Sequence, residues 1–313
     1  MKFKKYMHIE RYDTKSSKVK NYLYEDLIYV FPKIDGTNCQ TYMNDDGFIE
    51  AGNRTRVLSE NDNNMRFYQF AMSDERIKAF HTKYPNLRLY GEWMIEHTIK
   101  GYREDAMNKF YVFDVAKDNP ENPDGEPIYL TYDEYEPLIK EFNLDFIPPI
   151  VIIKGGTVFN KLEGYLNNNK FLIKTGSDDI GEGIVLKSYT FRPLDTWMER
   201  QLYCKIVRNE FKDLFMCNSS DRTTKVDIPE KKFLKLLTQP FVEKEYRKFV
   251  SEHNNQMERK EIKNLMKYIY RVLLDEELVD FIMQNPSVHL NFDYIWREYI
   301  RMLKEKLPEV FKK

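Results

Sequence analysis

The distribution of glycine is the feature of this sequence that most limits what it can fold into. All 12 glycines lie between Gly36 and Gly183, and none follows in the remainder of the 313-residue chain. Glycine supplies the positive-φ backbone that tight turns and bulges between strands require. We therefore predict a turn-rich, strand-containing N-terminal part and a helical C-terminal part.

Hydrophobic patterning predicts where strands and helices lie in the N-terminal part. A hairpin turn is expected at Asn44–Gly47, and a helix over residues 65–84 that ends before Pro85. A further helix is expected to open with the capping box of Thr131 and Glu134 and to run to about Phe142. Strands are expected over residues 29–33, 38–43, 87–93, 110–115, 150–153, 171–174, 183–188 and 202–207.

The C-terminal part is predicted to be a separate helical domain. Beyond residue 228 apolar residues recur at helical spacing, and Pro229 suits the first turn of a helix capped by Asp227. A single core stops growing at about 250–300 residues. We therefore predict two domains, residues 1–220 and residues 221–313.

The composition excludes several classes of protein. With 42% hydrophobic residues the chain can build a packed core, and a net charge of −1 excludes a globally basic nucleic-acid coat, although not a local basic groove. No apolar run approaches the roughly 18 residues of a membrane span, and the N-terminus lacks the apolar segment of a secretory signal. The three cysteines form no C-x-x-C pair, which disfavours a disulfide framework or a cysteine zinc site. These patterns predict a cytoplasmic protein with no membrane partner.

Lys33 lies at the end of a predicted strand, a position that would hold a catalytic nucleophile rigidly. A β-branched and aromatic run leads into it, and the chain then turns at Asp35-Gly36 before the next strand begins. An amine attacks only when it is neutral, a state that burial and nearby cations favour. From this segment alone, a nucleophile and a lysine on an ordinary hairpin are equally good interpretations.

Other charged residues follow on apolar strands in a particular order. Taken singly, each carboxylate is more typical of a solvated strand end than of a ligand site. Taken together, their order favours one shared site. The residues concerned are Glu92 after Gly91, Phe113 and Asp114 on an aromatic strand, Glu182 between two glycines, Lys187 five residues later, and Lys205 on the last predicted strand.

In this order the segments resemble the motifs of covalent nucleotidyltransferases, the group of ATP-dependent DNA ligases, RNA ligases and mRNA capping enzymes. Lys33-Ile-Asp-Gly36 is similar to their K-x-D/H-G nucleophile motif. Gly91-Glu92 is similar to the third motif, residues 110–115 to the aromatic motif after it, Glu182–Lys187 to the fourth and Tyr203-Cys-Lys205 to the fifth. The resemblance covers about residues 25–210.

Within that group the chain most resembles the RNA ligase 2 family of phage and kinetoplastid editing ligases. Lys33–Asn38 has that family's K-x-x-G-T-N form, Arg54-Thr55 matches its arginine-threonine element, and the C-terminal part is helical where DNA ligases and capping enzymes carry a β-rich OB-fold. Tyr203 departs from the family, because the fifth motif usually reads K-x-K. Asp35 stands where RNA ligase 2 itself has histidine. The resemblance implies an α+β fold: an ATP-grasp-like nucleotidyltransferase domain with antiparallel sheets and flanking helices, then a small all-α domain.

The resemblance implies an ATP-dependent RNA ligase that uses ATP and Mg²⁺, or Mn²⁺, as cofactors. The lysine would attack the α-phosphate of ATP and release pyrophosphate. The lysyl-AMP would then pass AMP to a 5′-phosphate RNA end, and a 3′-hydroxyl end would displace that AMP. A phage origin, a role in RNA repair, a location in the host cytoplasm and a monomeric state are further expectations from the family.

The same resemblance implies a role for each residue of the site. Lys33 would be the nucleophile, while Lys187 and Lys205 would neutralise the α-phosphate. Glu182 would hold the metal ion, because Mg²⁺ favours carboxylate oxygens. The nucleotide or the RNA end would be bound by Asn38 and Arg54, the ribose by Glu92, and adenine by Phe113, with Tyr111 as a substitute. We expect the helical part to bind the RNA strand, with contributions from Arg222, Lys225, Lys231 and Lys232. For any one of these four residues, a solvated helix face is the more ordinary interpretation.

Two other functions stay open from the sequence. A DNA ligase or a capping-type nucleotidyltransferase would share the motifs, although the helical C-terminal part disfavours both. A non-catalytic RNA-binding relic of the ligase fold is the third interpretation. Tyr203 favours the relic, whereas the intact site residues disfavour it, namely Lys33, Glu92, Glu182 and Lys187.

Overall fold

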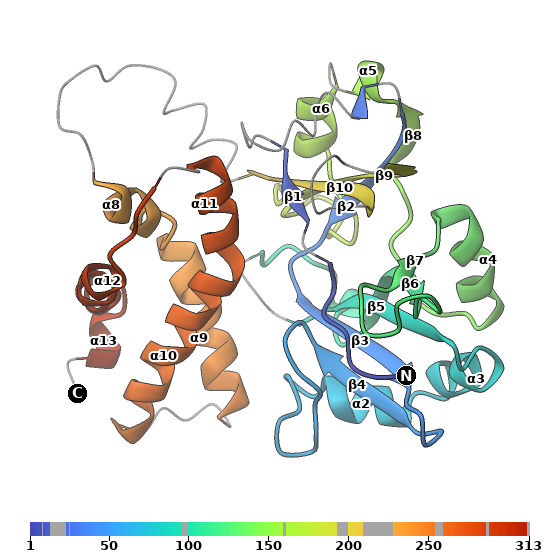
Figure 1. Cartoon of the computed structure of the whole chain (residues 1–313), viewed down its shortest axis with the longest axis horizontal. Coiled ribbons are helices and arrows are strands. Elements are labelled where there is room, and N and C mark those ends of the chain that lie inside the picture. Colours follow the sequence, from blue (N-terminus) through green and yellow to red (C-terminus); the bar gives the residue numbers. More distant parts are fainter. Residues whose placement is uncertain are drawn as a thin grey trace. The chain divides into compact units, whose positions relative to one another are not determined.

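The computed structural model has an α+β fold in two compact units, and the first unit contains both sheets (Figure 1). The structure describes residues 1–7, 9–12, 23–24, 26–95, 99–158, 161–192, 200–208, 228–253, 259–285 and 288–311. The described part of the first unit ends at residue 208, and that of the second begins at residue 228. The predicted boundary at 220/221 lies outside the described residues and stays a prediction.

Two five-stranded sheets form the framework of the first unit. Their strand pairs are antiparallel, apart from the parallel pair of β1 and β10. The first sheet has the order β1 (Glu10–Arg11), β10 (Arg200–Val207), β9 (Gly183–Arg192), β2 (Leu27–Lys33) and β8 (Val151–Lys154). The second has the order β4 (Ile49–Asn53), β3 (Thr37–Met43), β5 (Leu87–Trp93), β6 (Phe110–Lys117) and β7 (Ile128–Tyr129).

The side-chain alternation of β2 shows how the first sheet is covered. Ile28 and Val30 lie in a core with α5 (Gly155–Val158) and α6 (Leu162–Asn167), while Tyr29 and Phe31 lie in the large core that the second sheet also lines. Successive residues of a strand point to opposite faces. One face of the first sheet is therefore covered by short helices, and the other faces the second sheet.

Helices also contribute to this large core. Phe67 of α2 (Phe67–Ser73), Phe80 of α3 (Glu75–Lys83) and Tyr135 of α4 (Tyr132–Glu141) are fully buried in the same core as Leu89. A short 3₁₀ turn, η1 (Glu104–Ala106), precedes β6. The capping box at the start of α4 is confirmed, since Thr131 accepts from the N–H of Glu134 and Glu134 accepts from the N–H of Thr131.

Three local predictions are wrong. The helix expected over residues 65–84 is two helices, because the Asp74 carboxylate accepts hydrogen bonds from the N–H groups of Arg76 and Ile77 and so starts a new helix there. Residues 171–174 do not form a strand: only Ile173 makes an isolated bridge, and Leu172 has a positive φ of 63°. Helix α8 (Pro229–Leu234) has Ile228, not Asp227, at its N-cap.

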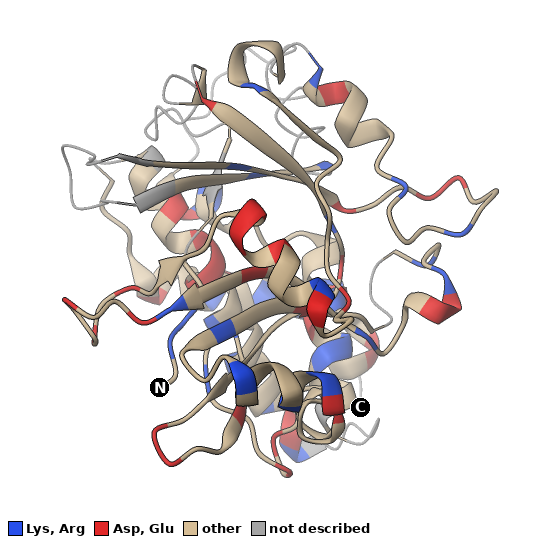
Figure 2. Ribbon diagram, turned by 90° about the vertical axis from the view of Figure 1, so that its right-hand side faces the viewer, with Lys and Arg blue, Asp and Glu red and all other residues tan. Residues whose placement is uncertain are grey.

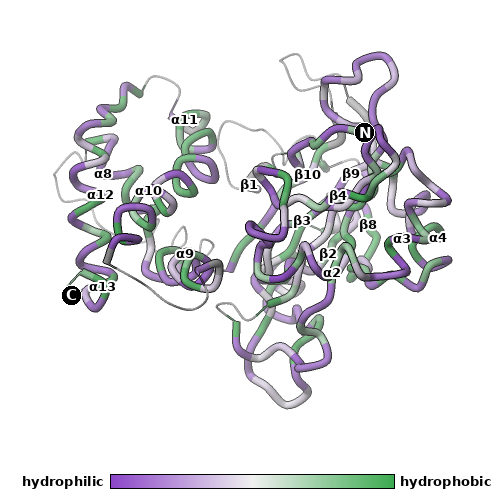
Figure 3. The backbone as a smooth tube through the Cα atoms, turned by 90° about the horizontal axis from the view of Figure 1, so that it is seen from below, coloured by the Kyte–Doolittle hydropathy of each residue, from purple (hydrophilic) through white to green (hydrophobic). Residues whose placement is uncertain are grey.

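All described elements of the second unit are helices, as the absence of glycine predicts. Hydrophobic residues alternate with hydrophilic ones along them (Figure 3). The apolar faces form one core that includes Phe233, Leu265, Ile295 and Leu303. The elements are α8, α9 (Gln239–Glu252), η2 (Arg259–Glu261), α10 (Ile262–Leu273), the π-helical turn η3 (Leu274–Leu278), α11 (Val279–Gln284), α12 (Phe292–Lys306) and α13 (Pro308–Phe311).

Acidic and basic residues are interspersed along the helices and loops seen in Figure 2, while the strands between them are mostly uncharged. Over the described residues, no helix has both the length and the apolar character needed to cross a membrane.

Candidate active site

Lys33 and Glu182 form the centre of the candidate site. Lys33 is the last residue of β2 and pairs with Gly183, the first residue of β9, so Glu182 lies directly beside it. The Lys33 Nζ lies 2.5 Å from the Glu182 Oε2, and the two side chains are 25% and 20% exposed. The pair is therefore accessible to a ligand. Without a ligand, the positive charge of Lys33 and the negative charge of Glu182 offset each other.

The turn after Lys33 carries the chain from the first sheet to the second. The N–H of Gly36 donates to the Glu92 Oε1 at 3.0 Å, and the N–H of Asp35 donates to the Tyr102 Oη at 2.9 Å. A Cβ on Gly36 would lie 2.6 Å from the carbonyl oxygen of Trp93, so only glycine allows β5 to approach the turn this closely. The predicted nucleophile and Glu92 are thus joined by one short segment.

Asn38 lies beside Glu92 on the second sheet. The two residues face each other across the β3–β5 pair. The Asn38 Oδ1 is buried and accepts no hydrogen bond from the residues that the structure describes. A buried acceptor without a donor is costly in a folded protein. This oxygen is therefore suited to accept a hydrogen bond from a ligand such as a nucleotide.

Arg54 follows the end of β4, which pairs with β3 next to Asn38. The Asn53 Oδ1 accepts hydrogen bonds from the N–H groups of Thr55 and Arg56, at 2.9 and 3.0 Å. This turn fixes the backbone on both sides of Arg54. The sequence motif Arg54-Thr55 is thus presented from a rigid loop on the sheet that carries Asn38 and Glu92.

Phe113 occupies an irregular position on β6. Opposite it, Gly91 pairs with Val112 and Tyr90 with Asp114, so Phe113 is the extra residue of a β-bulge. Bulges re-aim side chains and are common beside active sites. Phe113 is half-buried, whereas Tyr111 is only 5% exposed and belongs to the core. Of the two aromatic candidates, Phe113 is the more accessible to a ligand.

Lys187 is the most deeply buried cation of the predicted set and has an acidic partner. Its Nζ lies 2.7 Å from the Asp114 Oδ1 and 2.8 Å from the carbonyl oxygen of Phe113, with the side chain 3% exposed. Burial raises the pKa of Asp114 and lowers the pKa of Lys187, and the attraction between the two opposes both shifts. The Lys187 ammonium is thus buried and paired with Asp114 in this structure, and its expected contact with the α-phosphate stays a prediction.

Lys205 is the remaining cation of the predicted set. It lies on β10 opposite Val185 and is half-buried. Because residues two apart on a strand share a face, Lys205 points to the same side of the sheet as Tyr203. Asp114 and Tyr203, the partners of Lys187, were not assigned roles from the sequence. Their only signal was the position of Asp114 next to Phe113 and the departure at Tyr203.

A metal ion would have to be held by few protein groups. The described residues contain no cluster of three or more histidine, cysteine, aspartate or glutamate side chains that could bind one. Mg²⁺ keeps several waters and is commonly bound through one or two carboxylates together with substrate phosphates. Glu182, partly exposed beside Lys33, fits that kind of site.

Arg222 and Lys225, expected to contact RNA, lie outside the described residues.

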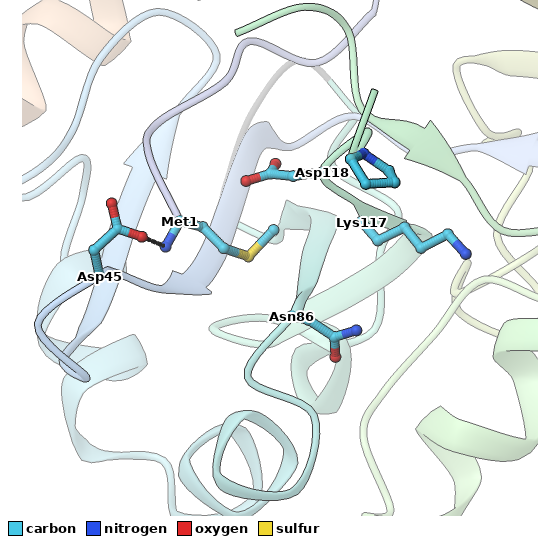
Figure 4. Close-up of a pocket in the computed structure, with 6 residues that line it drawn as sticks. Met1, Asp45, Asn86, Lys117 and Asp118 are labelled. Carbon is cyan, nitrogen blue, oxygen red and sulfur yellow. Dashed lines mark hydrogen bonds and ion pairs between the residues drawn. The ribbon is translucent and has the colours of Figure 1, made fainter. Parts of the chain in front are cut away.

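A separate pocket of about 350 Å³ has no part in this arrangement (Figure 4). It adjoins the end of the β5–β6 pair at which Leu87 pairs with Lys117. Glu92 lies near the opposite end, where Trp93 pairs with Phe110. None of its residues belongs to the predicted site. It is lined by Met1, Asp45, Asn86, Lys117, Asp118 and Pro120.

Comparison with protein families gives one match, to the family described as RNA ligase, over residues 26–200. This span contains seven of the eight predicted site residues, all but Lys205. Comparison of the sequence with curated proteins gives no match.

Solved structures of RNA ligases share the fold. An archaeal ATP-dependent RNA ligase is 13% identical, with a TM-score of 0.51 and coverage of 97% of this chain and 74% of that one. The Naegleria gruberi RNA ligase with pyrophosphate is 20% identical, with a TM-score of 0.50 and coverage of 69% and 58%. A variant of the same ligase with ATP and manganese is 19% identical, with a TM-score of 0.50 and coverage of 66% and 57%. This chain thus spans less than two thirds of the Naegleria protein.

Proposed function

The chain belongs to the RNA ligase family, and we propose that it is an ATP-dependent ligase that joins a 3′-hydroxyl and a 5′-phosphate RNA end. The observation that carries the proposal is the Lys33–Glu182 pair at the end of the first sheet, linked through Gly36 to Glu92 on the second. A nucleophile, a carboxylate for a metal ion and a polar group for a nucleotide are brought to one place from residues 33, 92 and 182.

In the first proposed step Lys33 attacks the α-phosphate of ATP, a P–N bond forms, and pyrophosphate leaves. The attacking amine must give up its proton and its contact with Glu182. A divalent cation bound at Glu182 would supply charge neutralisation at the phosphates. Lys205 would contribute a positive charge on the same side, which also favours neutral Lys33.

The nucleotide would be held from the second sheet. Phe113 would stack on adenine, Glu92 would accept hydrogen bonds from the ribose, and Asn38 and Arg54 would bind the nucleotide or the phosphate of the RNA end. Arginine suits a phosphate because its planar fork matches two oxygens. We assign Lys187 to positioning: through the Phe113 carbonyl and Asp114 it fixes the strand that carries the stacking ring.

The later steps transfer AMP to a 5′-phosphate and then join the ends. A P–O–P bond forms as the P–N bond to Lys33 breaks, and the 3′-hydroxyl then attacks the activated phosphate and expels AMP. Such in-line transfers depend mainly on positioning and charge neutralisation. The helical second unit, which includes the exposed Lys231 and Lys232, would contact the RNA backbone.

An end-joining assay tests this function. The protein is given ATP and Mg²⁺ or Mn²⁺ with RNA that carries a 5′-phosphate and a 3′-hydroxyl, in nicked-duplex and single-stranded form, beside the same strands as DNA. Joined RNA with ATP, and none with GTP or with Lys33→Ala, is the expected result. Joining of DNA alone would indicate a DNA ligase, and transfer of GMP would indicate a capping-type enzyme. A location in host cytoplasm, a phage origin and a monomeric state stay predictions.

A further inference from the structure

Tyr203 replaces the first lysine of the fifth motif, and the structure shows what surrounds it. Its side chain is 1% exposed and faces Lys187 across the β9–β10 pair. The Lys187 Nζ lies 4.9 Å from the centre of the Tyr203 ring, 4.7 Å from that of Phe31 and 5.8 Å from that of Phe113. Three aromatic rings thus surround one buried ammonium, which we call the Lys187 cage.

The side of the cage without a ring is closed by oxygen atoms that accept hydrogen bonds, rather than by solvent. The Asp114 Oδ1 and the Phe113 carbonyl oxygen accept from the Lys187 Nζ, while the Tyr6 Oη donates to the Asp114 Oδ2 at 2.5 Å. One carboxylate therefore balances one ammonium. A desolvated cation over an aromatic ring gains more than an exposed one, so each ring contributes to holding Lys187 in place.

The outer side of the Tyr203 ring is closed as well. The rings of Tyr129 and Tyr189 contact it edge-on, at centroid distances of 6.2 and 5.8 Å. Burial raises the pKa of the Tyr203 hydroxyl well above its ordinary value, so the group is neutral at physiological pH. Neither a phosphate nor a second cation has room or charge balance at this position.

We propose that Tyr203 is a positioning residue: its ring is a wall of the Lys187 cage, and through Lys187 it fixes the bulge that presents Phe113 to the nucleotide. The inference rests on the proposed function of the site. It has the consequence that the fifth motif offers a single cation, Lys205, to the nucleotide. In this proposal the tyrosine has a structural role in an active enzyme and is not evidence that catalytic activity has been lost.

Substitutions at Tyr203 separate this role from general stability. Tyr203→Phe keeps the ring, Tyr203→Leu keeps an apolar side chain without the ring, and Tyr203→Lys restores the usual motif. The matched control is Tyr299→Leu, because Tyr299 is equally buried but lies in the core of the second unit. Transfer of label from α-labelled ATP to the protein is measured against ATP concentration, well below each variant's unfolding temperature.

We expect Tyr203→Phe to keep the KM for ATP close to that of the natural protein. Tyr203→Leu should raise this KM by about tenfold, because a displaced Lys187 loosens the Phe113 bulge. Tyr299→Leu should lower the unfolding temperature without changing the KM. A Tyr203→Leu protein that lost only stability, like the control, would overturn the positioning role.

Tyr203→Lys gives a second, independent test. It would place two ammonium groups beside the one carboxylate of Asp114, so the unfolding temperature at pH 7 should fall. The folded state would lower the pKa of the new lysine, so this deficit should shrink as pH rises toward about 10, the ordinary pKa of lysine. Unchanged stability with stronger ATP labelling would show that this position opens to the nucleotide and would contradict the cage.

The natural protein and Lys33→Ala keep the two proposals distinguishable. If the natural protein takes no label, including after treatment with pyrophosphate to remove bound AMP, the proposed function fails. The cage is then judged on unfolding alone: the order natural protein, Tyr203→Phe, Tyr203→Leu, Tyr203→Lys in falling stability supports it, and equal stability of all four overturns it.

Discussion

At the scale of the residue, one charge pair changes how the site is understood. The resemblance places Lys187 at the phosphates, but its ammonium lies between Asp114 and three aromatic rings. The sequence around Lys187 does not indicate that Asp114 is its partner, because the two residues are 73 positions apart. The pairing of Lys187 with Asp114 is therefore a tertiary feature that sequence order alone could not predict.

Removal of Lys187 should unbalance the pair. We expect Lys187→Met to lose about 3–5 kcal/mol of unfolding free energy, because Asp114 would be buried without its cation. The folded-state pKa of Asp114 is raised, and more so without Lys187, so the loss should grow as pH rises from about 4 through that pKa. Unfolding temperatures at pH 5 and pH 8 measure this.

The double variant Lys187→Met with Asp114→Asn is the control for that prediction. With no buried charge left, it should be more stable at pH 8 than Lys187→Met alone, and its pH dependence should be flatter. A single variant as stable as the natural protein at both values would show that the pair is exposed to solvent, contrary to the structure.

At the scale of the element, most strands were predictable and their irregularities were not. The strand over residues 87–93 is confirmed to the residue, and the other strands that formed differ by one to four residues at their ends. The β-bulge at Phe113 has no sequence signal, since it arises from how β5 pairs with β6. The Asp74 cap lies in the polar run Ser73–Arg76, which is a helix-start signal that the prediction of one helix did not use.

Gly183 is the element-scale test of the site, because it sets the spacing of β9 and β10 beside Glu182. A Cβ there would lie 2.1 Å from the carbonyl oxygen of Ile206, which is backbone and cannot move aside. We expect Gly183→Ala to reduce labelling by ATP at least tenfold by displacing Glu182 from Lys33. Labelling is measured at saturating ATP and metal ion.

Gly164→Ala is the matched control for this substitution. Gly164 lies in α6, and a Cβ there meets nothing within 4 Å. It should leave labelling unchanged and stabilise the protein slightly, by about 0.5–1 kcal/mol. Equal labelling of the two variants would argue that the β9–β10 spacing does not position Glu182.

At the scale of the whole molecule, glycine content separates the two units, and the proposed steps divide between them. Every residue assigned to the reaction of ATP lies in the first unit, which was foreseeable from motif order. The helical unit was foreseeable from its apolar spacing, but its proposed contact with RNA is not encoded in any one residue pattern. Lysines on a helix face give the same sequence pattern whether they contact water or phosphate.

Separating the units should separate the steps. We expect a fragment of residues 1–211 to take label from ATP at a rate within a few fold of the whole chain. It should join RNA ends poorly, because backbone contacts supply much of nucleic-acid affinity. Labelling and joining of both proteins at low and high salt measure this, and efficient joining by the fragment would contradict the role of the helical unit.

Covalent adenylylation of Lys33 is tested most directly by the transfer of label from α-labelled ATP to the denatured protein. The natural protein, first treated with pyrophosphate, should take label with Mg²⁺ or Mn²⁺, and Lys33→Ala should take none. Mass spectrometry should place AMP on Lys33. Label that persists in the folded Lys33→Ala protein, or its absence from the natural protein under every condition, would contradict the role of Lys33 as the nucleophile.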